Sequence, residues 1–153
     1  MPGKKPKVGI ITGSKSDLPI VEKVEKQLKE FGIACDITVA SAHRTPKKVE
    51  SYAKLAEKKY DLIIAAAGMA AALPGVVAAQ TVLPVIGLPV YSKGLKGQDA
   101  LYAIVQMPSG IPVATVAIDG AKNAAILATQ ILSLKYVGLK NKLKQFKNKL
   151  AKG

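Results

Sequence analysis

The only histidine of the 153-residue chain, His43, lies in the segment SAHRTP (41–46) and is followed directly by Arg44. An imidazole can exchange a proton near neutral pH, and a guanidinium can hold a phosphate group through two donors. Thr45 can cap a helix that begins at Pro46. The segment therefore predicts a proton carrier beside an anion-binding cation, with a simple polar residue at a strand end as the alternative for His43.

Two other segments of unusual composition also follow predicted strands. In GSKSD (13–17), the glycine permits a sharp turn, and Ser14, Ser16 and Asp17 are suitable N-caps for the next helix. This segment predicts either an anion cradle at a helix N-terminus or an ordinary turn and cap. The segment AAGMAAALPG (66–75) is small and apolar, so it can line a tight, dry pocket or simply end a buried strand close to a helix.

Strands and helices alternate along the chain and must position these segments. Apolar runs rich in β-branched residues predict strands at 8–12, 34–40, 61–67, 83–89 and 111–118. Helical patterns lie between and after them, at 17–31, 46–59, 73–81, 97–106 and 121–136. This alternation predicts a parallel sheet covered by helices on both faces, in a three-layer α/β/α domain.

The strand order decides whether the three segments meet. In a doubly wound sheet, ligands bind beyond the carboxyl ends of the strands, where the order reverses. With the order 2-1-3-4-5, segments 13–17, 41–46 and 66–75 converge on one cleft. The sequence thus predicts three features at one edge of the sheet: a phosphate-binding turn, the proton carrier His43 beside the cation Arg44, and an apolar pocket.

Composition limits the class of protein. Hydrophobic residues make up 49% of the chain, which suits one globular domain, and no stretch is long enough for a membrane span. The single cysteine, Cys35, excludes an internal disulfide and fits a reducing cytosol. The net charge is +13, but eight lysines and no acidic residue follow Asp119, so most of this charge belongs to the end of the chain.

The Lys-rich end, 138–153, follows the predicted domain 1–137. Its apolar residues are spaced by four, three and four positions, which predicts one helical stripe: Leu139, Leu143, Phe146 and Leu150. We expect this helix to pack on its own domain or on a neighbouring subunit. The alternatives are a membrane-surface helix, which lacks a Trp anchor, and a nucleic-acid helix, which lacks interleaved aromatics.

Several motifs, in order, resemble the PurE family of purine biosynthesis, over about residues 7–136. They are GSKSD, SAHRTP, ALPGVVAA, PVIGLPV and IVQMPSGIPVATVAI followed by NAAILA. The resemblance implies a flavodoxin-like fold, a homo-octamer, a ribonucleotide substrate, and neither metal nor organic cofactor. The Lys-rich end adds an extra C-terminal helix to this fold, and the single cysteine favours a cytoplasmic location. The sequences SAHRTP and IVQMP are most similar to those of the bacterial type, which has N5-carboxyaminoimidazole ribonucleotide mutase activity.

The resemblance also implies roles for individual residues. The bacterial type moves a carboxylate from N5 to C4 through bound CO2, with a histidine, here His43, that shuttles the proton lost from C4. The resemblance assigns the phosphate and ribose contacts to Ser14, Ser16, Asp17 and Arg44. It implies that Ser41 and Ala42 help to form the site. It also places Gly68, Ala70 and Leu73 beside the imidazole and CO2.

One departure from the family pattern bears on the activity. Bacterial members usually have AGGAAHLPG where this chain has Met69 in place of a glycine and Ala72 in place of a histidine. Relatives of the animal type, which carboxylate aminoimidazole ribonucleotide directly with CO2, also lack that histidine. Direct carboxylation, or a weakly active oligomeric scaffold of the same fold, therefore stand as alternatives to the mutase.

Overall fold

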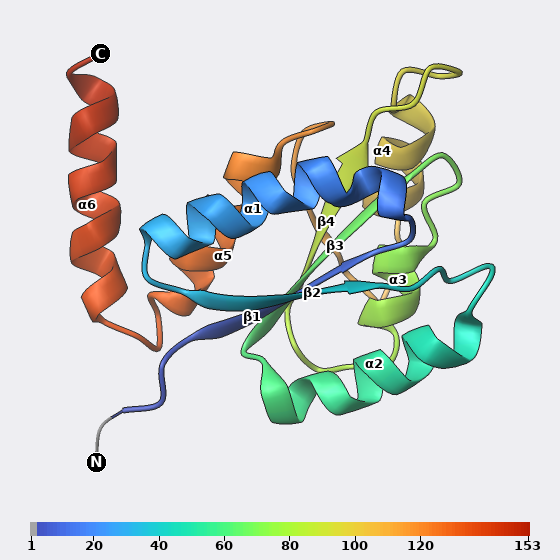
Figure 1. Ribbon diagram of the computed structural model, residues 1–153, viewed down its shortest axis with the longest axis horizontal. Helices are drawn as coiled ribbons and strands as arrows, with labels where there is room; N and C mark the ends of the chain where they lie inside the picture. Colours follow the sequence, from blue (N-terminus) through green and yellow to red (C-terminus); the bar gives the residue numbers. More distant parts are fainter. Residues whose placement is uncertain (1–2) are drawn as a thin grey trace.

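The computed structural model describes residues 3–153 and contains a five-stranded parallel sheet (Figure 1). The strand order is β2-β1-β3-β4-β5, which confirms the predicted order 2-1-3-4-5. The strands are β1 (Lys7–Thr12), β2 (Ala34–Val39), β3 (Leu62–Gly68), β4 (Val85–Val90) and β5 (Ala114–Thr115). The first two residues of the predicted domain 1–137 lie outside the described residues.

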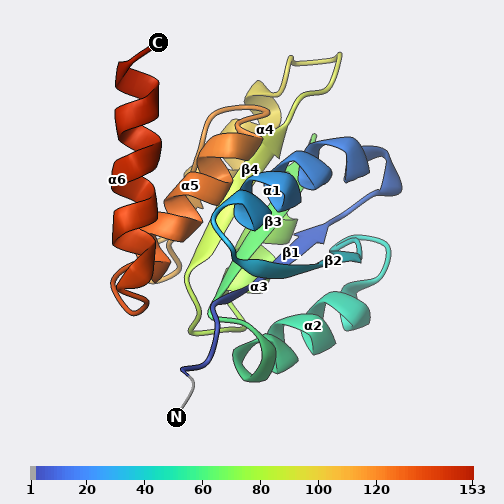
Figure 2. The same ribbon diagram turned by 60° about the vertical axis from the view of Figure 1, so that its left-hand side comes forward.

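Helices cover both faces of this sheet, as Figures 1 and 2 show. One face carries α1 (Leu18–Glu30), which follows a short 3₁₀ turn η1 (Lys15–Asp17), together with α5 (Ala121–Leu132). The last helix, α6 (Gly138–Ala151), packs against α5 at the side of the domain. The other face carries α2 (Pro46–Lys59), α3 (Leu73–Ala78) and α4 (Gln98–Val105). The predicted three-layer α/β/α architecture is therefore confirmed.

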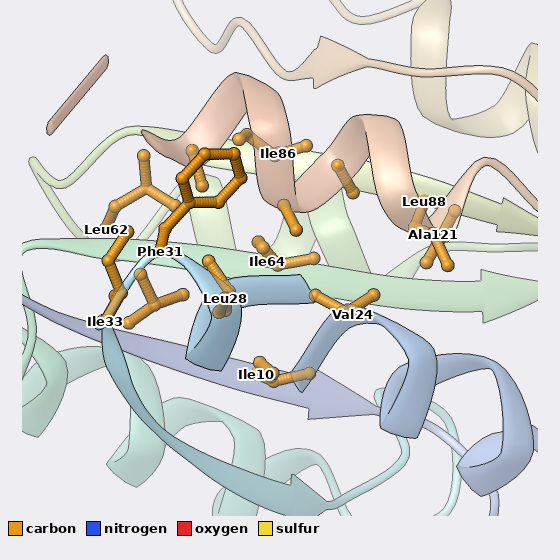
Figure 3. Packing of buried hydrophobic residues seen from close by; sticks show 14 of the residues in the cluster. Ile10, Val24, Leu28, Phe31, Ile33, Leu62, Ile64, Ile86, Leu88 and Ala121 are labelled. Carbon is orange, nitrogen blue, oxygen red and sulfur yellow. The ribbon is translucent and has the colours of Figure 1, made fainter. Parts of the chain in front are cut away.

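The two layers of core follow from the alternation of side chains along each strand. Ile10 of β1 and Ile64 of β3 belong to the cluster beneath α1 and α5, whereas Ile11 and Ile63 belong to the cluster beneath α2, α3 and α4. All four are fully buried. Figure 3 shows Leu28 of α1 facing the first cluster. Central strands buried on both faces must be apolar at every position, which explains their continuous hydrophobic runs.

The predicted element boundaries were wrong at the fifth strand and at three helix ends. Only residues 114 and 115 of the predicted strand 111–118 form a ladder, with Ile86 and Gly87 of β4. Pro112 has no N–H to donate, and an edge strand has a partner on one side only. Helices predicted to reach residues 81, 136 and 153 end at residues 78, 132 and 151.

The start of α6 packs on its own chain. Leu139 and Leu143 are 5% and 8% exposed, and the Phe146 ring meets Phe31 edge to face at 5.5 Å between centroids. Leu150, in contrast, is 65% exposed, and the end of α6 stands away from the sheet in both views of the fold (Figures 1 and 2). Within residues 3–153, no helix is both long and apolar enough to cross a membrane.

Asp61 joins the start of the sheet to the segment between α5 and α6. Its carboxylate accepts hydrogen bonds from the Lys7 backbone N–H at 3.1 Å, Lys135 Nζ at 3.0 Å and Tyr136 Oη at 3.0 Å. Burial alone would raise the pKa of this carboxyl, but these three donors outweigh burial and lower the pKa below its usual value. The charged form of Asp61 is therefore favoured in the folded state.

We expect Asp61→Asn to lower the free energy of unfolding by about 1–3 kcal/mol at pH 7, because three donors lose a charged acceptor. A depressed pKa stabilises the fold above the unfolded-state pKa, and this contribution is lost as the pH falls through the folded-state pKa. The difference between wild type and variant should accordingly shrink below about pH 4. Urea unfolding at pH 7 and pH 3.5 measures both effects, and equal stability at pH 7 would contradict this role.

Candidate active site

A cavity of about 600 Å³ lies at the carboxyl edge of the sheet, where β1, β2, β3 and β4 end. Each candidate catalytic or substrate-binding residue predicted from the sequence lines this cavity. They are His43, Ser14, Ser16, Asp17, Ser41, Ala42, Arg44, Gly68, Ala70 and Leu73. The structure thus brings the three segments together, as expected from the carboxyl ends of neighbouring parallel strands.

The segment after β1 forms a compact polar turn. Ser14 caps η1, and its Oγ accepts the Ser16 backbone N–H at 3.2 Å and lies 2.8 Å from Ser16 Oγ. Asp17 occupies the N-cap position of α1, but its side chain makes no capping bond and instead accepts a hydrogen bond from Thr12 Oγ1 at 3.2 Å. The Ser16 side chain interacts with the Asp17 carboxylate, and Ser14, Ser16 and Asp17 all line the cavity.

Burial raises the pKa of Asp17, and the negative charge of Asp119 raises it further, against the hydrogen bonds from Thr12 and Ser16. The Asp17 side chain lines the cavity, so it can contact a molecule bound there. It can accept hydrogen bonds from hydroxyl groups of a bound molecule, such as those of a ribose.

The segment after β2 is held by hydrogen bonds between its own residues. The Ser41 N–H donates to Thr45 Oγ1 at 2.9 Å, and Thr45 Oγ1 donates to the Ser41 carbonyl at 3.1 Å. Thr45 occupies the N-cap position of α2, but its hydroxyl makes no capping bond because it is engaged with Ser41. The closed turn places His43 and Arg44 at the cavity, both exposed to solvent.

Arg44 connects the first two segments. Its Nη2 donates to the Gly13 carbonyl at 3.0 Å, while its backbone N–H donates to Ser41 Oγ at 3.2 Å. One side of the guanidinium is therefore fixed to the turn after β1. Arg44 also lines the cavity together with Ser14 and Ser16, and its guanidinium has N–H donors beyond the one bound to Gly13.

The segment after β3 forms the apolar wall. Ala71 and Leu73 are buried, and Ala72 also lines the cavity. Met69 is 66% exposed and has a left-handed backbone with φ of 56°. This left-handed conformation favours glycine. Met69, which replaces the glycine of bacterial members, therefore lies at a position whose backbone is poorly suited to a side chain.

Val90, Tyr91 and Ser92 at the end of β4 form a fourth wall of the cavity, which was not predicted from the sequence. The predicted strand order 2-1-3-4-5 could have indicated this wall. β4 is the other neighbour of β3, so its carboxyl end must lie at the same edge of the sheet. A hydroxyl-bearing pair directly after an apolar strand has the same character as the serines after β1. Within residues 3–153, no group of three or more His, Cys, Asp and Glu side chains is arranged to hold a metal.

The sheet order and the cavity at its carboxyl edge define a doubly wound α/β protein of the flavodoxin-like class. Residues 7–153 match the family described as AIR carboxylase, and the chain belongs to this family, which includes the proteins called PurE. The resemblance inferred from GSKSD, SAHRTP and the later motifs is therefore confirmed.

Two curated relatives and one solved structure show how this chain compares. It is 58% identical to N5-carboxyaminoimidazole ribonucleotide mutase of Pyrococcus horikoshii over 147 residues, covering 95% of this chain and 83% of that protein. It is 52% identical to phosphoribosylaminoimidazole carboxylase of Saccharomyces cerevisiae over 143 residues, covering 93% of this chain but 25% of that protein. The crystal structure of Treponema denticola PurE superposes with a TM-score of 0.90 at 37% identity, covering 97% and 93% of the two chains.

Proposed function

We propose that this protein is an N5-carboxyaminoimidazole ribonucleotide mutase of purine biosynthesis. The observation that carries the proposal is that His43, Arg44, the GSKSD turn and an apolar wall all line one cavity of about 600 Å³. The relative from Pyrococcus horikoshii, named as this mutase, gives it further support.

The polar half of the cavity suits a ribonucleotide. Arg44, Ser14 and Ser16 supply the donors that a phosphate group requires, and Asp17 supplies an acceptor for ribose hydroxyls. Ser41 and Ala42 shape the turn that carries the histidine. The substrate is thereby held with its imidazole toward the opposite, apolar half of the cavity.

The apolar half suits a neutral intermediate. The N5–carboxylate bond breaks, CO2 is released inside the cavity, and N5 takes up a proton from His43. C4 then attacks the same CO2, a C4–carboxylate bond forms, and the C4 proton passes back to His43, which is thereby restored. Gly68, Ala70 and Leu73 confine the CO2 during this exchange, because small apolar walls exclude the water that would hydrate it.

The test offers the two possible substrates separately. Incubation with N5-carboxyaminoimidazole ribonucleotide should form the C4-carboxylate without added bicarbonate. Incubation with aminoimidazole ribonucleotide and bicarbonate should form it far more slowly. Only trace product from both substrates would instead support the alternative of a weakly active scaffold.

Direct carboxylation of aminoimidazole ribonucleotide is the second candidate, favoured by Ala72. This residue lines the cavity at the position where the bacterial pattern has a histidine. This chain is also 52% identical over 143 residues to a yeast protein named as a carboxylase, which supports this candidate. A faster reaction with aminoimidazole ribonucleotide and bicarbonate than with the N5-carboxylated substrate would favour this candidate.

We further propose that the protein acts in the cytoplasm as a homo-octamer. Three apolar side chains near α6 are well exposed in the single chain: Leu134 and Val137 before its start and Leu150 in its last turn, at 79%, 68% and 65%. Contacts with neighbouring subunits would bury these side chains. The proposed interface therefore includes the end of α6, whereas its start belongs to the core of its own chain.

Light scattering should give about eight times the 16.0 kDa mass of one chain. Leu150→Ser should lower this mass at micromolar concentration, because it places a hydroxyl in the proposed contact. The matched control, Leu143→Ala, should lower the free energy of unfolding by about 2–5 kcal/mol through a cavity in the core of each subunit. A 16.0 kDa species for the wild-type protein would contradict the assembly.

A further inference from the structure

Asp119 lies outside the cavity lining but holds the end of β4 by two hydrogen bonds. Its backbone N–H donates to the Pro89 carbonyl at 2.8 Å, and its Oδ1 accepts the Tyr91 backbone N–H at 2.9 Å. The ladder between β4 and β5 ends at residue 115, so these bonds continue the pairing where β5 has stopped. We call them the Asp119 clamp.

The backbone of Asp119 is adapted to this position. Its φ of 57° is left-handed, a conformation that Asp and Asn adopt more readily than other residues with a side chain. Its carbonyl accepts the Ala121 N–H at 2.8 Å at the start of α5. The turn between β5 and α5 is thus built so that one carboxylate oxygen reaches back to the neighbouring strand.

The clamped residues form the fourth wall of the cavity. Val90 pairs with Gly68 across the β3–β4 ladder, and Tyr91 and Ser92 continue this wall. A methyl group on Gly68 would lie 3.3 Å from the Val90 carbonyl oxygen, so the two strand ends are in close contact. The clamp therefore acts on the strand end that lies directly against the apolar segment.

We propose that Asp119 is a positioning residue, which keeps the Val90–Ser92 wall closed against Gly68 and so retains CO2 in the cavity. This proposal rests on the proposed function, since it concerns the CO2 formed from the N5-carboxylate. With the wall loosened, CO2 leaves before C4 attacks it, and water converts it to bicarbonate. The organic product is then aminoimidazole ribonucleotide, with N5 protonated and the C4 proton in place.

Two substitutions separate the hydrogen bond from the backbone conformation. Asp119→Asn keeps the Oδ1 acceptor and tolerates the left-handed φ. Asp119→Gly suits this φ even better but has no acceptor. As a matched control, Asp99→Ala removes a carboxylate that accepts the Ala100 N–H at 2.9 Å and does not line the cavity.

The readout is the ratio of released aminoimidazole ribonucleotide to C4-carboxylate, corrected for breakdown without protein. Amide hydrogen exchange at Tyr91 reports on the clamp independently of activity. For Asp119→Gly we expect both the ratio and the exchange rate to rise about tenfold, the factor that the loss of one hydrogen bond permits. Asp119→Asn and Asp99→Ala should stay within about twofold of wild type in both measurements.

Unchanged exchange and an unchanged ratio in Asp119→Gly would overturn the proposal, as would an Asp119→Asn variant that behaves like Asp119→Gly. Faster exchange with an unchanged ratio would overturn the role in CO2 retention. If the wild-type protein forms no C4-carboxylate at all, the proposed function fails. Exchange at Tyr91 then still decides whether Asp119 holds this wall.

Discussion

His43→Asn should lower kcat with the N5-carboxylated substrate by about 10²–10⁴-fold, the usual contribution of a general acid–base group. Asparagine is close to histidine in size and polarity but cannot exchange a proton at neutral pH. His43 is exposed in a turn that the Ser41–Thr45 hydrogen bonds hold, so the substitution should leave the fold intact.

Two controls belong to this experiment. Thermal unfolding should be unchanged in His43→Asn, and the variant should bind the C4-carboxylated product with wild-type affinity. Turnover close to that of wild type would end the assignment of His43 as the proton carrier.

Arg44→Ala should raise KM by about 10–100-fold, because a charged hydrogen-bond donor contributes about 1.5–3 kcal/mol. It removes both the donors proposed for the phosphate and the bond to the Gly13 carbonyl that joins the first two segments. The interaction exists before and after the carboxylate moves, so kcat should change less than KM.

Arg44→Lys should fall between wild type and Arg44→Ala, since an ammonium keeps the charge but not the planar pair of donors. Lys48→Ala is the matched control. Lys48 donates to the Val39 carbonyl at 2.8 Å from the start of α2 but does not line the cavity, so KM should stay unchanged. An unaltered KM in Arg44→Ala would show that the phosphate lies elsewhere.

The buried parts of the fold and the convergence of the site could be predicted from local patterns. Apolar runs such as 62–67 have to be central strands when helices alternate with them, and the carboxyl ends of parallel strands meet at one edge. For this reason, GSKSD, SAHRTP and the segment after β3 could be assigned to one cavity without coordinates.

The parts that could not be predicted depend on contacts between distant residues. The length of β5 depends on how many of its residues pair with β4, and only two do. The apolar run 111–118 does not indicate this number. The left-handed backbone of Met69 and the bond from Tyr91 to Asp119 likewise arise only when strand ends and loops are packed together. The spacing of apolar residues indicates whether a segment is a helix or a strand and which of its sides is buried. It contains little information on which loop atoms form hydrogen bonds with each other.

The most direct test of the central claim follows one carbon atom. N5-carboxyaminoimidazole ribonucleotide labelled with ¹³C in its carboxylate is mixed with the wild-type protein in unlabelled bicarbonate, and the C4-carboxylate is examined by ¹³C NMR. Transfer through CO2 held in the cavity predicts that the product retains the label. Product that carries unlabelled carbon would contradict the claim, because its carboxylate would then have come from the solution.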